Sequence, residues 1–379
     1  MSKKQIIKNC IILLLMICAI TTITLYICNE KVRNVIDQYI LKKEILEEKT
    51  TSIDFEGEEN QFVYAYDKYI VVLKNGILTY YNSSGNKMFT KEVSISNPIF
   101  ASNEKFLCIT ENGGNKIYLL SGENIVWQGE IEGNIDKANV NKNGYVSIVV
   151  KGTSYRTVII SFNDKGKELF KTYLSSSSAI QTDISNDNKY LAIAEVNSSG
   201  SIVQSYVKLI SIQKAEKEPT NSVVYTYKAD AGSLITNIKY QDKGKLVCMY
   251  NDNVQIVEEG KSEKIIDIDN QSQYVDINLK NTILNIKLKQ KGIFNNTLEV
   301  LMKDINHQTE NLYTIDGTIR FIETRGENIA INMGSDVHFI NTSGWLLKKY
   351  KANQEITDIV LGDSIAGIVY RNKIDVISL

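Results

Sequence analysis

The sequence predicts an all-β fold: a closed β-propeller of about eight four-stranded blades, with seven as the alternative, preceded by one N-terminal transmembrane helix. A unit of about 35–45 residues with four strand-forming runs recurs from about residue 62 to the end. β-Branched and aromatic residues fill these runs, and Asn, Ser, Gly and Lys separate them. The last unit ends at 374–378 without a fourth strand, while a spare strand at 52–55 precedes the first unit. Pairing of these two ends closes the ring and leaves no open sheet edge.

The composition argues against a nucleic-acid-binding protein and against a disordered chain. The 379 residues contain 43 Lys and Arg against 44 Asp and Glu, a formal net charge of −1. Such a balance lacks the basic excess of nucleic-acid-binding proteins, so we expect no nucleic-acid partner. Only two prolines and 22 glycines occur, which argues against a disordered or linker-rich chain.

The N-terminal stretch predicts a membrane anchor. Lys3, Lys4 and Lys8 precede an uncharged run over 9–29, which is long enough to span a bilayer core of about 30 Å. The positive-inside rule then puts a tail over 1–8 in the cytoplasm and the rest outside the membrane. The alternative, a cleaved signal peptide, lacks a small-x-small cleavage site, because the residues at 25–28 are Leu-Tyr-Ile-Cys. The segment 30–50 has apolar residues at helical spacing and predicts a helix or stalk, and 51–379 forms the propeller.

Each unit begins with a strand, followed by a polar turn and three further strands. The clearest unit, over 180–196, joins Ile-Gln-Thr-Asp-Ile to a second apolar run through Ser-Asn-Asp-Asn-Lys. First strands are expected at 62–66, 98–101, 135–140, 180–184, 235–240, 274–279, 319–322 and 356–360. The turns after them are expected at 67–68, 102–105, 141–144, 185–189, 241–244, 280–281, 324–327 and 362–363. The fourth unit carries extra residues over 213–221, which predict a charged surface loop.

The repeated unit over 180–194 and the predicted anchor carry a resemblance. Together they resemble the bacterial, membrane-anchored propellers of WD40-like and quinoprotein-like type, a family catalogued as a domain of unknown function. The resemblance covers most of the chain and implies a propeller in the cell envelope, without an activity. The chain departs from WD40 repeats because no Gly-His and Trp-Asp pair recurs in each unit. A segment ending in Trp127 is similar to the docking motif of quinoprotein blades, but it does not recur, so a quinone cofactor is not supported.

The residues needed for catalysis are scarce. The only histidines are His307 and His338, and no Gly-x-Ser-x-Gly or phosphate-binding loop exists. We therefore predict no enzyme activity, no catalytic residue, no cofactor and no metal site. Cys108 and Cys248 each lie inside a predicted strand, where a buried core thiol is the favoured interpretation and a disulfide between them the alternative.

One set of polar residues is a candidate ligand site. Similar places on the first strands are occupied by Asn139, Asp183, Asn237, Asp276 and Asp358. Inner strands of a propeller surround its axis, so these side chains are expected to form a polar ring at a channel mouth. The alternative is that each side chain bonds to backbone in its own or a neighbouring blade, which is common for Asp and Asn.

These observations favour a non-catalytic, membrane-anchored, extracytoplasmic propeller that acts as a protein-binding scaffold in the cell envelope. Its partner is expected to be another envelope protein, because a propeller presents a wide rigid face. The alternative is a sensor that binds a glycan or small ligand at the polar ring or at a tyrosine-lined pocket. A polysaccharide-cleaving enzyme would need paired acids in a cleft.

Overall fold

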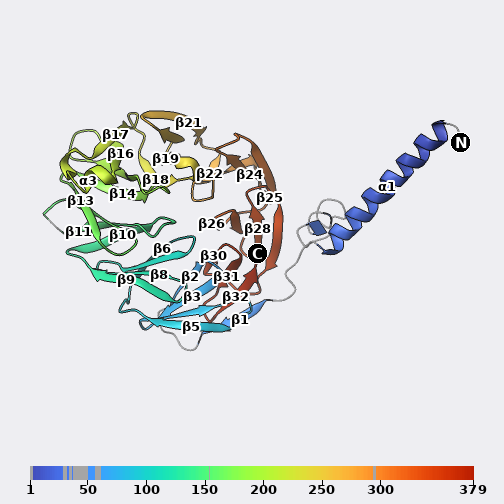
Figure 1. The fold of residues 1–379 in the computed structure, drawn as a ribbon, viewed down its shortest axis with the longest axis horizontal. Helices are drawn as coiled ribbons and strands as arrows, with labels where there is room; N and C mark the ends of the chain where they lie inside the picture. The colour runs from blue at the N-terminus through green and yellow to red at the C-terminus, as the bar shows by residue number, and fades with distance from the viewer. Residues whose placement is uncertain are drawn as a thin grey trace.

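A computed structural model describes residues 3–28, 32–33, 36, 50–55, 61–152, 154–292 and 296–379. Within them, 32 strands form eight antiparallel sheets of four strands each. Figure 1 shows these sheets arranged around a central axis, with the first strand of each sheet innermost. The predicted propeller is confirmed, with eight blades rather than seven. Below, A to D denote the strands of a blade from the axis outward.

The blades follow one another along the chain. The strands of blades 1 and 2 are β2 (Gln61–Tyr66), β3 (Tyr69–Lys74), β4 (Ile77–Tyr81), β5 (Lys87–Glu92), β6 (Pro98–Asn103), β7 (Phe106–Glu111), β8 (Lys116–Ser121) and β9 (Asn124–Glu130). Blades 3 and 4 contain β10 (Asn134–Val140), β11 (Val146–Lys151), β12 (Thr157–Phe162), β13 (Glu168–Leu174), β14 (Ser177–Ile184), β15 (Tyr190–Asn197), β16 (Gln204–Ser211) and β17 (Val223–Lys228).

The second half of the ring repeats the pattern. Blades 5 and 6 contain β18 (Ile235–Tyr240), β19 (Leu246–Tyr250), β20 (Asn253–Glu258), β21 (Lys261–Asp267), β22 (Ser272–Asp276), β23 (Thr282–Gln290), β24 (Thr297–Asp304) and β25 (Glu310–Asp316). Blades 7 and 8 contain β26 (Phe321–Arg325), β27 (Asn328–Asn332), β28 (Asp336–Asn341), β29 (Leu346–Lys351), β30 (Asp358–Leu361), β31 (Ile365–Val369), β32 (Lys373–Ser378) and, as strand D of blade 8, β1 (Thr51–Asp54).

The core is divided among the junctions between blades. Eight apolar clusters exist in the described residues, and each combines side chains from two neighbouring blades. The B strands therefore pack on both faces, which explains why β7, β11 and β31 are apolar runs without alternation. The D strands, such as β9, are mostly exposed. Cys108 and Cys248 are free thiols that are fully buried in two different clusters, which confirms the interpretation as core residues.

The N- and C-terminal strands close the ring as predicted. β1 pairs antiparallel with β32, with Ile53 opposite Ile374. Ile53 is buried in the cluster between blades 8 and 1. Because β1 completes blade 8, the two ends of the β region are joined and the outer edge of β32 is covered.

The prediction of a membrane anchor is wrong. Helix α1 covers Lys3–Cys28, yet no helix in the described part of the chain is long and apolar enough to cross a membrane. The transmembrane segment over 9–29, the membrane contact and the single-pass location inferred from it are corrected accordingly. The helix predicted over 30–50 lies almost wholly outside the described residues.

The stretch predicted as a charged surface loop over 213–221 is exposed except at Ala215. Part of it forms the short helix α3 (Ile212–Ala215), whose first turn is capped by the Ser211 hydroxyl, followed by a 3-10 turn at Pro219–Asn221. Ile212 and Ala215 are buried in the cluster between blades 3 and 4. The charge of this stretch hid the two apolar residues that anchor it to the core.

A candidate ligand cavity at the axial mouth

The turns between A and B strands gather on one face of the propeller, called here the AB face. Hydrogen bonds link them from blade to blade. The bonds join Asn141 Nδ2 to Ser185 O (3.0 Å), Asn186 Nδ2 to Gln241 O (3.4 Å), Gln241 Nε2 to Ile277 O (3.0 Å), Lys280 N to Gly326 O (2.7 Å), Asn328 Nδ2 to Asp363 O (3.1 Å) and Asp363 N to Asp67 O (3.1 Å). The Tyr66 hydroxyl continues the series to the Lys105 carbonyl. These bonds hold the AB turns in fixed positions around the axis.

The five residues of the predicted polar ring lie on inner strands, and several bond to backbone. Asp183 is 3% exposed and accepts the Tyr240 N–H (2.6 Å) from the next blade. Asp276 accepts the Asn278 N–H (2.6 Å) and the Thr324 hydroxyl (2.9 Å). The other three are Asn139, whose Oδ1 is buried without a partner in the described residues, and Asn237 and Asp358, which each accept the next backbone N–H. None of the five lines the cavity described below, and a ligand site formed by them remains a prediction.

Asp183 provides a test of the backbone-bonding alternative. Burial raises the pKa of Asp183, while Lys239 and the Tyr240 N–H oppose the rise. We expect Asp183→Ala to lower the free energy of unfolding by about 1–3 kcal/mol, because the Tyr240 N–H loses its acceptor. Asp183→Asn keeps an acceptor oxygen and should cost less. Urea unfolding of both variants measures this, and equal losses would show that the charge matters instead of the bond.

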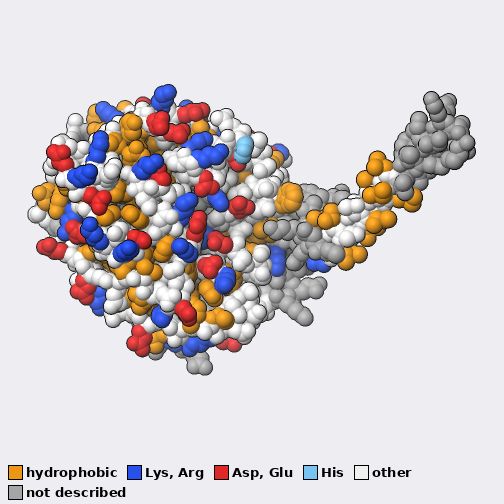
Figure 2. All heavy atoms as spheres, viewed as in Figure 1, with side chains coloured by type: hydrophobic (Ala, Val, Ile, Leu, Met, Phe, Trp, Pro, Cys, Tyr) orange, Lys and Arg blue, Asp and Glu red, His pale blue; other side chains and the backbone are white. Residues whose placement is uncertain are grey.

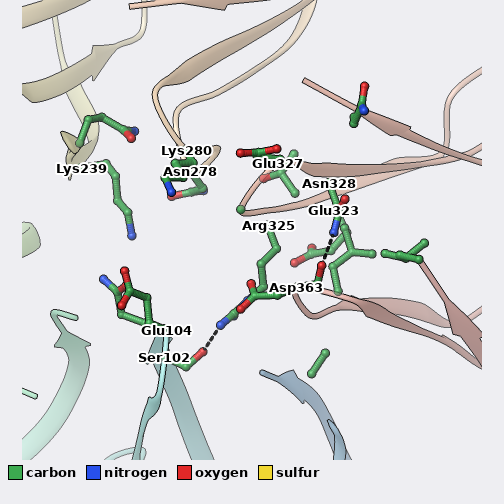
Figure 3. Close-up of a pocket in the computed structure, with 18 of the residues that line it drawn as sticks. Ser102, Glu104, Lys239, Asn278, Lys280, Glu323, Arg325, Glu327, Asn328 and Asp363 are labelled. Carbon is green, nitrogen blue, oxygen red and sulfur yellow. Dashed lines mark hydrogen bonds between the residues drawn. The ribbon is translucent and has the colours of Figure 1, made fainter. Parts of the chain in front are cut away.

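A cavity of about 890 Å³ opens at the axis on the AB face. Its lining comes from the ends of A strands and from the AB turns of all eight blades. It includes Tyr64, Ser102, Glu104, Lys142, Asn186, Lys239, Asp242, Asn278, Lys280, Glu323, Arg325, Glu327 and Asp363. Figure 3 shows Lys239 and Lys280 on one side, Glu323 and Asp363 on the other, and Arg325 between them. Figure 2 shows basic and acidic side chains mixed over one face of the molecule, rather than a field of one sign.

Arg325 reaches across the mouth. It ends strand β26 of blade 7, yet its guanidinium donates to the Tyr64 hydroxyl of blade 1 (3.0 Å) and the Ser102 hydroxyl of blade 2 (2.6 Å). The Tyr64 and Ser102 hydroxyls are themselves 2.8 Å apart, and the Tyr64 ring stacks on Phe100. Both partners are neutral, and within the described residues Arg325 makes no ion pair within 4 Å. Its positive charge acts at longer range on Glu323 and Asp363, where it opposes the rise in their pKa.

Glu323 is the acid most strongly perturbed in the cavity. Burial, together with the negative charges of Asp358 and Asp276, raises its pKa to about 7, and Arg325 opposes the rise. Strongly shifted acids in a cavity are frequent at functional sites. Glu323 is therefore the cavity residue whose charge changes near neutral pH.

The cavity extends from the axis to an apolar end. Trp345, Leu346, Leu347 and the C-terminal Leu379 line it there, with Asn341 at the turn between β28 and β29. The Asn341 side chain accepts the Trp345 N–H (3.0 Å) and so fixes the turn that carries the indole. Trp345 is 44% exposed. The cavity thus combines a charged axial part with an aromatic outer part.

Neither histidine takes part in the cavity. His338 lies in β28, and its Nδ1 is 2.9 Å from the Tyr313 hydroxyl. Burial, together with the positive charge of Lys349, lowers the pKa of His338 to about 4. His307 lies in the turn after β24, 3.3 Å from Asp304. In the part of the chain that the structure describes, no three His, Cys, Asp or Glu side chains are grouped to hold a metal ion.

Sequence reasoning missed the main cavity residues, although a signal for them exists. Arg325, Lys280, Glu104 and Asp363 all lie in turns that the sequence predicts after first strands. A closed propeller brings all such turns to one face, so charged residues in them meet at the axis. Trp345 lies at the turn between strands C and D of the same blade, which an antiparallel sheet brings to the AB face.

Comparison with known proteins supports the fold at low sequence identity. The C-terminal WD40 domain of Sif2 has a TM-score of 0.59 at 11% identity, covering 87% of this chain and 98% of that one. Chaetomium thermophilum Sqt1 bound to the N-terminus of ribosomal protein L10 gives 0.53 at 11%, covering 87% and 100%. The tricorn protease gives 0.50 at 11%, covering 78% of this chain and 34% of that one. These similar structures thus include an enzyme beside WD40-type propellers.

No curated protein matches the chain in sequence. A family model does match, over residues 42–379, which is the whole propeller and the segment just before it. The match agrees with the predicted resemblance to a propeller family of unknown function. The chain belongs to the family of unknown function DUF5711.

Proposed function

We propose that this protein is a non-catalytic propeller that binds a segment of a partner protein in the axial cavity of the AB face. The observation that carries the proposal is the cavity itself, about 890 Å³ in volume and lined by charged side chains and an exposed tryptophan. Arg and Trp are enriched among the residues that contribute most to protein binding. A rigid fold holds them in place before a partner arrives, which reduces the entropy lost on binding.

Two further observations support this proposal. Sqt1, a propeller of similar fold, is bound to the N-terminus of another protein, so this architecture accommodates a chain segment. The two histidines are remote from the cavity lining, which leaves a Ser-His-Asp arrangement without its base there. An uncharged or polyanionic ligand would use only part of the mixed lining.

A display experiment tests the proposal. Random peptides on phage are selected on the full chain and then measured on an Arg325→Ala, Trp345→Ala double variant. We expect the selected peptides to lose at least about tenfold in affinity, since one hot-spot residue contributes 2 kcal/mol or more. Tyr173→Ala is the matched control, because Tyr173 is an exposed aromatic residue (52%) on the outer strand β13.

Two results would overturn the proposal. Peptides that bind the double variant as tightly as the unchanged protein would locate the contact outside the cavity. If no peptide is selected while soluble glycan fragments bind in calorimetry, the protein is a ligand sensor instead. Thermal unfolding of each variant confirms that the ring remains folded.

A further inference from the structure

The lysines of the cavity lack anionic partners. Lys142, Lys239 and Lys280 come from blades 3, 5 and 6. In the described residues, none of the three side chains makes an ion pair within 4 Å or a hydrogen bond. Other lysines of the propeller do pair, as Lys208 does with Glu195 at 2.7 Å. The lysine side of the cavity is therefore ready to receive an anionic group.

Three acids of the cavity make no direct ion pair, although the charge of Arg325 opposes the rise in the pKa of Glu323 and of Asp363. Glu323 and Glu327 come from blade 7 and Asp363 from blade 8. None of these carboxylates accepts a hydrogen bond or pairs with a cation within 4 Å among the residues described. Asp242, by contrast, is held by the Asn281 side chain at 2.8 Å. The acidic side is ready to receive a cationic group.

Figure 3 shows Lys239 on one side of the cavity and Glu323 and Asp363 on the other, while the acid Glu104 lies on the side of Lys239 and Glu327 lies beside Lys280. A ligand of a single sign would be attracted by one set and repelled by the other. A ligand that carries both signs in the matching order is attracted by both sets. Because the cavity walls displace water, these interactions are stronger than they would be on an open surface.

The outer part of the cavity favours one orientation of a bound segment. Trp345 and Leu347 lie at the turn between strands C and D of blade 7 and at the start of strand D, farther from the axis than the AB turns. An extended segment that enters the mouth therefore has its charged residues near the axis and an apolar residue against the indole. This arrangement matches the usual composition of an interface, with an aromatic anchor and charged neighbours.

We infer that the partner segment is a mixed-charge peptide: it carries acidic side chains for the lysines, a basic side chain for Glu323 and Asp363, and a large apolar residue for Trp345. The inference rests on the proposed function and specifies the chemistry of the partner. A polyanion such as nucleic acid is repelled by the acids of the cavity, and a purely basic peptide is repelled by its lysines.

The peptides selected by display on the full chain provide the first test. We expect them to be enriched, relative to the starting library, in both acidic and basic residues and in an aromatic or aliphatic residue. The tightest peptide is then synthesised in two further forms, with its acidic or its basic side chains replaced by amides. Each form should bind about three- to tenfold more weakly by fluorescence anisotropy.

Variants of the protein that remove one charge identify which protein side chain contacts which charge of the peptide. Lys239→Gln should weaken binding of the original peptide but have little further effect on binding of the peptide that lacks acidic side chains. Glu323→Gln should weaken binding of the original peptide but have little further effect on binding of the peptide that lacks basic side chains. Lys261→Gln and Glu130→Gln, both on exposed D strands, are the matched controls.

The pH dependence gives an independent readout. Glu323 faces Asp276, Asp358 and Arg325, and it ionises as the pH rises through about 7. Binding of the mixed-charge peptide should therefore strengthen from pH 6 to pH 8, and Glu323→Gln should remove most of this change.

The outcomes separate the two proposals. Selected peptides that need the cavity but carry charges of one sign only would overturn this inference and leave the proposed function intact. A failure to select any peptide that depends on Arg325 and Trp345 would overturn both.

Discussion

A chain that begins at residue 56, and so lacks β1, is expected to lose the cooperative unfolding of the propeller. Blade 8 would keep only three strands, and the outer edge of β32 would expose its unpaired backbone groups. The apolar cluster between blades 8 and 1 would also lose Ile53. We expect the unfolding temperature to fall by about 10 °C or more, with aggregation in light scattering as exposed edges pair between molecules.

A chain that begins at residue 50 is the control, because it retains β1. The full chain with Ile53→Ala is an intermediate case and should lose about 2–4 kcal/mol, as expected for a buried Ile. If the chain from residue 56 unfolds at the same temperature as the control, closure by β1 contributes little and the ring is held by its other junctions.

Asp375→Ala is the substitution with the largest expected effect on stability. Asp375 is 2% exposed on β32. It accepts the Ser52 hydroxyl of β1 (2.5 Å) and the Tyr350 hydroxyl of blade 7 (2.6 Å), and pairs with Lys373 (2.8 Å). Its removal leaves a lysine and two hydroxyls without their acceptor, so we expect a loss of about 3–5 kcal/mol in urea unfolding.

The same carboxylate makes stability depend on pH. Burial alone would raise the pKa of Asp375, but hydrogen bonds from Lys373, Ser52 and Tyr350 outweigh it and lower the pKa below its ordinary value. The stabilisation is therefore complete above the unfolded-state pKa of about 4 and is lost as the pH falls below it. Asp375→Asn should flatten this acid limb, while Glu263→Gln, on exposed β21, should not. An unchanged acid limb in the Asn variant would assign the pH dependence to other carboxylates.

The architecture could be predicted because it depends on local patterns. The unit over 180–196 shows alternation, a polar turn and a second apolar run, and each of these follows from short-range backbone preferences. Closure could be predicted from a count of strands, since the surplus strand at 52–55 and the missing one after 374–378 are both visible in the sequence. The thiols of Cys108 and Cys248 likewise lie in the core, because their strands are apolar on both faces.

Two stretches differ in part from what their composition favours. The uncharged run over 9–29 predicts a membrane span from composition alone, whereas no helix in the described residues meets the length and apolarity that a span requires. The charged stretch over 213–221 predicts a loop, whereas Ala215 within it and Ile212 just before it are held in the core.

The sequence by itself determined the strands, the turns, the number of repeats and the way the ring closes, because these depend on neighbours in the chain. Only the tertiary structure decided which turn residues meet. Arg325 contacts Tyr64 and Ser102 across more than two hundred residues, and Trp345 joins the same cavity from a different turn. A cavity is formed by residues that are distant in the chain, so its charges and its shape emerge only when the ring has closed.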